Sequence, residues 1–159
     1  MNRFKSEENI KQTVACYGDM LMRTCFALLV NRYDAEEAVQ ETFLSYMVTK
    51  KEFRDEEHTK AWLLRVAVNK SKNILRSRHR RLYVNLEDIQ EVVAEEEKQE
   101  MLTEIMQLPY PIKTAIHLHY YEGYTCKEIG DIVGATEAAV KKRLQKGREL
   151  LRDILESGE

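Results

Sequence analysis

The chain has 159 residues and a net charge of −2, and its length suits one ordinary domain or two small ones. It is 43% hydrophobic and 33% charged with only 6 Gly and 2 Pro, which favours helices over sheets, and its 3 widely spaced cysteines argue against a disulfide framework. No apolar run suits a signal peptide or a membrane span, so we expect a soluble protein of the cytoplasm.

Two helices are predicted in the first third of the chain, where apolar and small residues recur at helical spacing. The buried face of the first is expected to contain Val14, Tyr17, Leu21, Thr24 and Leu28. After a break near Asn31 to Tyr33, we expect Asp34 to cap the second helix, with Glu37 as its capping-box partner. The second helix is expected to be anchored by Ala35, Val39, Phe43, Tyr46 and Met47.

A third helix is predicted from Thr59 to about Leu82, after a polar loop or broken helix at Lys50 to Glu57. One side is apolar and contains Leu63, Leu64, Ala67, Val68, Ile74 and Leu75. The other side contains Trp62, Arg65, Val66, Asn69, Lys72, Asn73, Arg76 and Arg80. Between Lys60 and Arg81 lie eight basic residues and no acidic one, so this side is interpreted as a nucleic-acid surface and not as a solvated face. Trp62 taken alone is more typical of a core residue.

The charge then changes sign, because eight acidic residues and one Lys lie between Leu82 and Ile112. Residues 87–100 are expected to form a flexible acidic linker, since they offer few apolar groups to bury. A second domain is predicted to begin near Met101 with a short helix that ends at Leu108. Another helix should follow the nearby prolines, from about Ile112 to Tyr121.

The pattern after Gly123 predicts a helix-turn-helix. Thr125 is expected to cap a short helix, with Glu128 at the capping-box position. Gly134 suits the tight turn, and Thr136 is expected to cap a last helix that runs to about Leu155. Two capped helices joined by a short glycine-containing turn are typical of this motif.

The last helix has an apolar arc composed of Val140, Leu144, Gly147 and Leu151. The opposite face contains Ala138, Lys142, Gln145, Lys146 and Glu149, flanked by Lys141 and Arg143. Lys and Gln can bond guanine and adenine edges in a major groove, whereas Arg143 and Arg148 lie nearer the core side and suit phosphates. A solvated charged face is the alternative, which the preceding capped helix and glycine turn disfavour.

Catalytic and metal-binding motifs are not found in the sequence. It contains no P-loop, no HExxH and no glycine-rich phosphate loop. His117 and His119 are two residues apart and would point in different directions on a helix, so a shared metal is not expected. We interpret the histidines as ordinary surface or interface residues, and we expect no enzyme activity, no metal and no cofactor.

Four stretches, in order and spanning roughly residues 10–155, resemble the extracytoplasmic-function family of bacterial sigma factors. DAEEAVQETF, from Asp34, is similar to the helix that binds core RNA polymerase, and WLLRVAVNKSKNILR, from Trp62, to the helix that reads the −10 element. LPYPIKTAIHLHYYEGYTCKEIGDIVG, from Leu108, and TEAAVKKRLQKGRELLR, from Thr136, are similar to the domain that reads the −35 element.

The resemblance implies an all-α protein with two small helical domains, 1–83 and 101–159, joined by a flexible linker at 84–100. It implies three partners, namely core RNA polymerase, promoter DNA and an anti-sigma factor. The polymerase-binding residues would be Asp34, Glu37, Gln40 and Glu41, and the −10-reading residues would be Trp62, Asn69, Asn73, Arg76 and Arg80. The −35-binding residues would be Thr136, Lys141, Lys142, Arg143, Gln145, Lys146 and Arg148.

Some residues depart from the family pattern, which usually has Gly-Thr at Ala138-Ala139, a small residue at Lys142 and Ala at Gly147. Glycine within a helix costs about 1 kcal/mol relative to Ala. These departures bear on which promoters are read. Two other functions stay open as alternatives, namely a stand-alone helix-turn-helix regulator, which would usually dimerise on a palindrome, and a protein-interaction adaptor with both basic faces solvated.

Overall fold

A computed structural model describes residues 5–77, 105 and 107–157, and these residues form helices and turns without any strand. This confirms the predicted all-α class. The chain divides into two compact units, Met1–Tyr83 and Val84–Glu159. The predicted acidic linker, 84–100, and most of the predicted helix that ends at Leu108 lie outside the described residues. No described helix is both apolar enough and long enough to cross a membrane.

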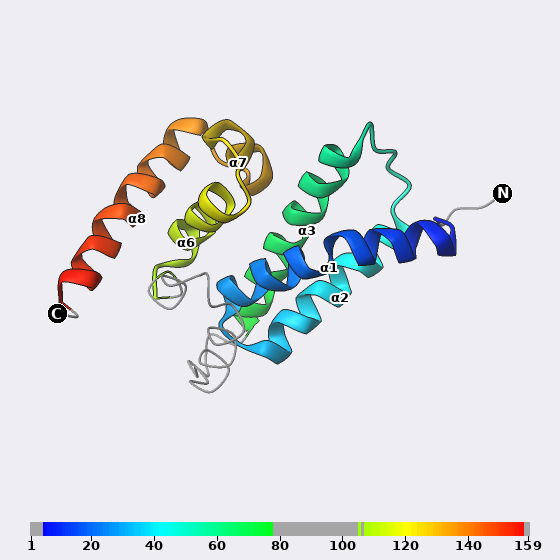
Figure 1. The fold of residues 1–159 in the computed structure, drawn as a ribbon, viewed down its shortest axis with the longest axis horizontal. Coiled ribbons are helices and arrows are strands. Elements are labelled where there is room, and N and C mark those ends of the chain that lie inside the picture. Colours follow the sequence, from blue (N-terminus) through cyan, green and yellow to red (C-terminus); the bar gives the residue numbers. More distant parts are fainter. Residues whose placement is uncertain (1–4, 78–104, 106, 158–159) are drawn as a thin grey trace. The chain divides into compact units, whose positions relative to one another are not determined.

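The N-terminal unit consists of three mutually packed helices, α1 (Glu7–Leu29), α2 (Arg32–Val48) and α3 (Glu56–Ser77) (Figure 1). Its core contains fully buried side chains from α1 and α3, namely Leu21, Phe26, Leu28, Leu29, Leu63 and Leu64. The predicted apolar side of α3 is confirmed over its first half, where Leu63, Leu64, Ala67 and Val68 are all buried.

Helix α1 begins after Ser6, whose hydroxyl accepts a hydrogen bond from the Asn9 N–H at 3.1 Å. Of the predicted buried face, Leu21, Thr24 and Leu28 are buried. Val14 is 42% exposed, so its assignment to that face was wrong. The helix ends at Leu29, and its C-cap Val30 has a φ of 53°, in the left-handed region that β-branched residues rarely adopt. In this conformation the Val30 side chain is buried, and the Val30 N–H donates to the Phe26 carbonyl at 2.8 Å.

Helix α2 is capped by Asn31, and the prediction that Asp34 caps it was wrong. The Asn31 side chain accepts the Asp34 N–H at 2.9 Å, so Asp34 is capped and already lies in the first turn. Helix α3 likewise begins before the predicted Thr59. There the Asp55 carboxylate accepts the His58 N–H at 2.8 Å, which places the helix start at Glu56. In both helices a capping residue that precedes the predicted start determines where the helix begins.

The C-terminal unit contains α6 (Tyr110–Ile116), the π-helical turn η1 (His117–Tyr121), α7 (Cys126–Val133) and α8 (Glu137–Ser157). The helix predicted from Ile112 to Tyr121 therefore begins two residues earlier and widens at its end. The widening is visible in the hydrogen bond from the Glu122 N–H to the His117 carbonyl at 3.2 Å.

His117 is fully buried, so its interpretation as a surface residue was wrong. Its ring Nε2 lies 3.2 Å from a Glu122 carboxylate oxygen, and its ring stacks on Tyr121 at a centroid distance of 5.4 Å. A polar side chain can be buried when it has such partners. Glu122 is one of these partners, because the π-helical turn η1 places it next to His117, five residues earlier.

Candidate nucleic-acid and partner interfaces

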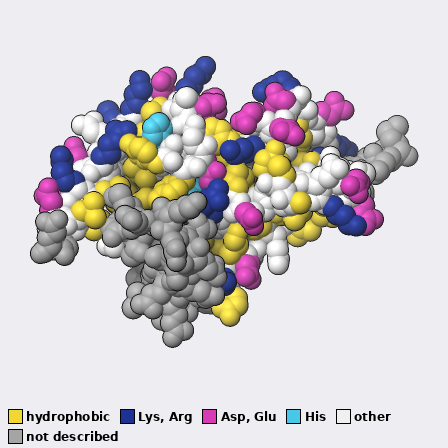
Figure 2. Space-filling view, viewed as in Figure 1, with side chains coloured by type: hydrophobic (Ala, Val, Ile, Leu, Met, Phe, Trp, Pro, Cys, Tyr) yellow, Lys and Arg dark blue, Asp and Glu magenta, His cyan; other side chains and the backbone are white. Residues whose placement is uncertain are grey.

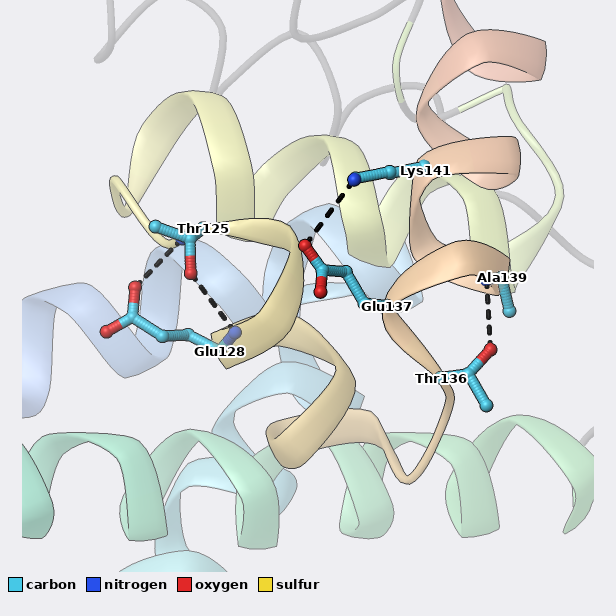
Figure 3. Close-up of polar contacts among 6 residues, drawn as sticks. All are labelled: Thr125, Glu128, Thr136, Glu137, Ala139 and Lys141. Atoms are coloured by element: carbon cyan, nitrogen blue, oxygen red, sulfur yellow. Dashed lines mark hydrogen bonds and ion pairs between the residues drawn. The ribbon is translucent and has the colours of Figure 1, made fainter.

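The short helix of the predicted helix-turn-helix has the capping box that the sequence indicates. The Thr125 hydroxyl accepts the Glu128 N–H at 3.2 Å, and a Glu128 carboxylate oxygen accepts the Thr125 N–H at 2.9 Å (Figure 3). These reciprocal bonds satisfy two N–H groups at the helix start that no backbone carbonyl reaches. They fix where α7 starts and hence where the turn begins.

The turn between α7 and α8 depends on two glycines. Gly134 has a φ of 73°, as its predicted role in the turn requires. The N–H groups of Gly134 and Ala135 both donate to the Gly130 carbonyl at 2.9 Å. A Cβ at Gly130 would lie 2.5 Å from the Ala135 carbonyl oxygen, so the chain can return this closely only over a glycine. Sequence reasoning missed Gly130, because it lies within an otherwise ordinary helical stretch.

Helix α8 starts and packs as predicted. The Thr136 hydroxyl accepts the Ala139 N–H at 3.1 Å, which confirms the expected cap (Figure 3). Val140, Leu144, Gly147 and Leu151 are all buried, which confirms the apolar arc. A Cβ at Gly147 would lie 2.8 Å from Ile116 Cδ1 and 3.0 Å from Ile112 Cγ2. The helix-propensity cost of Gly147 is therefore offset by the close approach of α8 to α6.

The predicted DNA-binding residues of α8 lie on the surface. Those that are exposed are Thr136, Lys141, Lys142, Gln145, Lys146 and Arg148, whereas Arg143 is half-buried. Figure 2 shows Lys and Arg side chains along α8 on the visible face. Lys141 lies 3.5 Å from Glu137, and because both side chains are more than half exposed, the pair is weak enough for Lys141 to exchange partners.

Helix α3 presents the second predicted surface. Its exposed polar side chains are Arg65, Asn69, Lys72, Asn73 and Arg76, whereas Arg80 lies outside the described residues. Asn69, Asn73 and Arg76 recur at intervals of four and three residues, so they share one face of the helix. Amide and guanidinium groups on one exposed face can bond base edges and phosphates.

Trp62 lies at the start of this surface and is half-buried in an aromatic cluster. Its ring contacts Phe53 at a centroid distance of 5.4 Å and Tyr46 at 6.3 Å. Lys5 covers the cluster, with its Nζ 4.5 Å from the Tyr46 ring centroid and 3.1 Å from the Thr49 carbonyl oxygen. Desolvation lowers the pKa of Lys5. Sequence reasoning identified Trp62 but missed Phe53 and Lys5, since neither lies on a periodic helix face.

The residues predicted to bind polymerase lie together on the outer side of α2. Glu37 and Gln40 are exposed, whereas Asp34 and Glu41 are half-buried. Three of the four line a groove of about 410 Å³ between α2 and α3, whose lining residues are Asp34, Glu37, Glu41, Lys70, Asn73, Ile74 and Ser77. Asn73 therefore lies where the predicted polymerase surface adjoins the predicted DNA surface.

Three large apolar side chains continue the outer face of α2. Tyr33 is 75% exposed, Leu44 58% and Val48 57%. At 100° per residue these side chains fall on the same stripe as Glu37 and Gln40. Exposed apolar groups gathered on one face are typical of a contact surface. Sequence reasoning overlooked this stripe because it assigned apolar residues of the helix to the core.

Comparison with known proteins identifies both units. Residues 13–81 match the family model Sigma-70 region 2, and residues 98–151 match Sigma-70, region 4. The chain belongs to the extracytoplasmic-function family of RNA polymerase sigma factors. This sigma factor accordingly directs RNA polymerase to promoters.

Curated relatives match along most of this sigma factor. SigW of Bacillus subtilis is 27% identical over 161 aligned positions, which cover 89% of this chain and 86% of the relative. The sigma-E factor of Haemophilus influenzae is 28% identical, with 80% of this chain and 77% of the relative covered.

Solved structures share the fold. CnrH, in complex with the cytosolic domain of CnrY, matches with a TM-score of 0.74 at 21% identity over 97% of this chain and 92% of that one. RpoE of Bartonella quintana, in complex with the anti-sigma factor NepR, matches with a TM-score of 0.73 at 19% identity over 94% of this chain and 98% of that one. At these identities the likeness concerns the fold alone.

Proposed function

We propose that this sigma factor binds core RNA polymerase through α2, reads the −10 element with α3 and reads the −35 element with α8. The observation that supports it is that three exposed helix faces present two kinds of chemistry. One is acidic and apolar, and two combine basic with amide side chains. In this function the protein positions polymerase and captures DNA, and it catalyses no covalent step. We infer that it acts in the cytoplasm, where the polymerase and the promoters are.

The α2 face suits a partner surface with basic groups between apolar ones. Glu37 and the groove carboxylates Asp34 and Glu41 supply negative charge, and Gln40 supplies hydrogen bonds. Leu44 and Val48 would then provide apolar contact, which contributes affinity, while the charges mainly set specificity and association rate.

The α3 face suits a melted −10 element. Asn69 and Asn73 can bond an unpaired base edge, and Arg76 can neutralise phosphate. The half-exposed Trp62 offers part of a ring for stacking, while its other contacts hold it against Phe53. Arg80 is included among the proposed −10-binding residues on the basis of the sequence alone.

The outer face of α8 suits the major groove of the −35 element. Lys142, Gln145 and Lys146 would reach base edges, whereas Thr136, Lys141, Arg143 and Arg148 would contact phosphates. With Ala138 and Ala139 at the helix start, the hydroxyl that the family places there is missing. We therefore expect backbone contacts at this end to depend on Thr136 and Lys141.

An anti-sigma factor is the third partner that we propose. Both of the solved structures compared above are complexes, and in one of them RpoE is bound to the anti-sigma factor NepR. A partner that covers the α2 face would keep the factor from polymerase, because the two would compete for the same side chains.

Capture of core polymerase followed by run-off transcription tests the proposal. Tagged factor should retain core polymerase and then support promoter-specific transcripts. Glu37→Lys should weaken capture, because it reverses a charge on the groove. The matched control Glu36→Lys makes the same change on the neighbouring exposed residue, which does not line the groove, and should bind normally.

Each competing function gives a different result. A stand-alone regulator would bind a palindromic duplex without polymerase, and an adaptor would support no promoter-specific transcript. Equal capture of wild type, Glu37→Lys and Glu36→Lys would contradict the assignment of the α2 face.

A further inference from the structure

A tyrosine outside the predicted DNA-binding set holds one of its arginines. Tyr120 lies in η1 and is 54% exposed. The Nε–H of Arg148, 28 residues later on α8, donates to the Tyr120 hydroxyl at 2.6 Å. The guanidinium carbon of Arg148 also lies 5.7 Å from the centre of the Tyr120 ring. An exposed arginine side chain is thereby fixed by a residue of another element.

Tyr120 is itself held in place by its neighbour. The His119 ring meets the Tyr120 ring edge to face, at a centroid distance of 4.8 Å and an interplanar angle of 85°. His119 Nδ1 lies 2.8 Å from the Tyr124 carbonyl oxygen. Because that oxygen can only accept, Nδ1 carries a proton and donates it. The histidine is thus anchored to the backbone just past η1, and it supports the tyrosine.

This arrangement leaves donors for an anion. Arg148 uses Nε for the tyrosine, so the four N–H groups of its two Nη atoms remain to donate to a partner. The Tyr120 oxygen accepts from Arg148, so its own O–H can donate elsewhere. A phosphate oxygen is the ligand that takes bonds from both groups, since it only accepts and carries the opposite charge.

The place of Arg148 on α8 indicates which anion this is. Lys141, Arg148 and Arg152 recur at intervals of seven and four residues, so they form a stripe along one flank of the helix. This stripe lies beside the face that bears Lys142 and Lys146. If that face enters a major groove, the flank meets the sugar-phosphate backbone at its edge.

We propose that Tyr120 is a positioning residue for the −35 element, which holds Arg148 against a DNA phosphate and donates its own hydroxyl hydrogen to the same phosphate. The proposal rests on the proposed function of α8. Prior ordering of the long arginine side chain reduces the rotamer freedom lost when DNA binds. Tyr120 therefore strengthens binding to all −35 sequences alike and does not select among them.

Binding of promoter duplex by the reconstituted holoenzyme tests this role. Affinity is measured against salt concentration for wild type, Tyr120→Phe, Arg148→Ala and the double variant. Tyr120→Phe keeps the ring and loses only the hydroxyl, so affinity should fall about two- to tenfold with an unchanged salt slope. Arg148→Ala should weaken binding and reduce the slope by about one. In the Arg148→Ala background, Tyr120→Phe should have a smaller effect, because only the tyrosine's own bond to the phosphate is then lost and there is no arginine left to position.

Tyr121→Phe is the matched control, because it removes a hydroxyl from the next residue, whose ring stacks on His117. It should bind DNA like wild type, and all variants should show wild-type helix content. If Arg148→Ala weakens binding but Tyr120→Phe does not, or if Tyr120→Phe acts equally in both backgrounds, the positioning role is refuted while the function of α8 stands. If Arg148→Ala changes neither affinity nor salt slope, the phosphate contact itself is refuted.

Discussion

Single residues in this protein show how a close backbone approach constrains residue choice. Gly130, Gly134 and Gly147 each permit something different, namely a carbonyl contact, a left-handed turn and a tight helix crossing. Only Gly134 could be predicted from the sequence, since a glycine at the end of a helix is a local signal. The constraints on Gly130 and Gly147 come from Ala135 and Ile116, and they exist only once the chain has folded.

Gly130→Ala should destabilise the C-terminal unit strongly. The new Cβ would lie 2.5 Å from the Ala135 carbonyl oxygen, and backbone cannot give way as a side-chain end can. We expect a loss at or above the upper end of the roughly 1–3 kcal/mol that overpacking costs. Gly18→Ala in α1 is the control, because no atom lies within 4 Å of its Cβ and the change should stabilise by up to about 1 kcal/mol. Urea unfolding measures both, and equal effects would contradict the role of Gly130.

At the scale of elements, signals within a few residues predicted the helices well. Thr125 with Glu128 and Thr136 with Ala139 lie within one turn of their partners, so both caps could be read in advance. Asn31 and Asp34 illustrate the limit of such reading. Both are good capping residues, and the helix uses the earlier one, whose side chain accepts the Asp34 N–H.

Contacts between elements could not be predicted in the same way. Phe53 contacts both Tyr46 and Trp62 because α2 and α3 pack together, and Lys5, which precedes α1, reaches Tyr46 because α1 packs on α2. The bond between Tyr120 and Arg148 spans 28 residues and depends on the π-helical turn. Periodicity identifies which side of a helix faces outward, but it does not identify which residues of other elements contact that side.

The apolar part of the α2 face should contribute to polymerase binding. Leu44→Ser replaces an exposed apolar side chain, so it should leave the fold intact and weaken binding of core polymerase by about 1 kcal/mol or more, as an interface anchor would. Val14→Ser on α1 is the control, because Val14 is 42% exposed and lies on no proposed surface. Fluorescence titration of labelled factor with core polymerase gives both affinities. Identical affinities for the two variants would place the contact elsewhere.

At the scale of the whole molecule, the proposed function divides recognition between two units. The N-terminal unit carries the polymerase face and the α3 face, and the C-terminal unit carries the α8 face. When the −10 and −35 elements are read separately, their specificities for promoter sequence multiply. Each unit then needs only a few base contacts. A net charge of −2 is compatible with DNA binding because the basic side chains are gathered on two helix faces.

Transcription of a randomised promoter library by reconstituted holoenzyme tests this division most directly. Asn69→Ala on α3 should relax base preference within the −10 element alone, and Lys146→Ala on α8 within the −35 element alone. Each change should cost on the order of 1–3 kcal/mol at about one position, because each removes one base contact. A changed preference in the other element for either variant, or a uniform loss of transcription for both variants without any changed preference, would contradict this division.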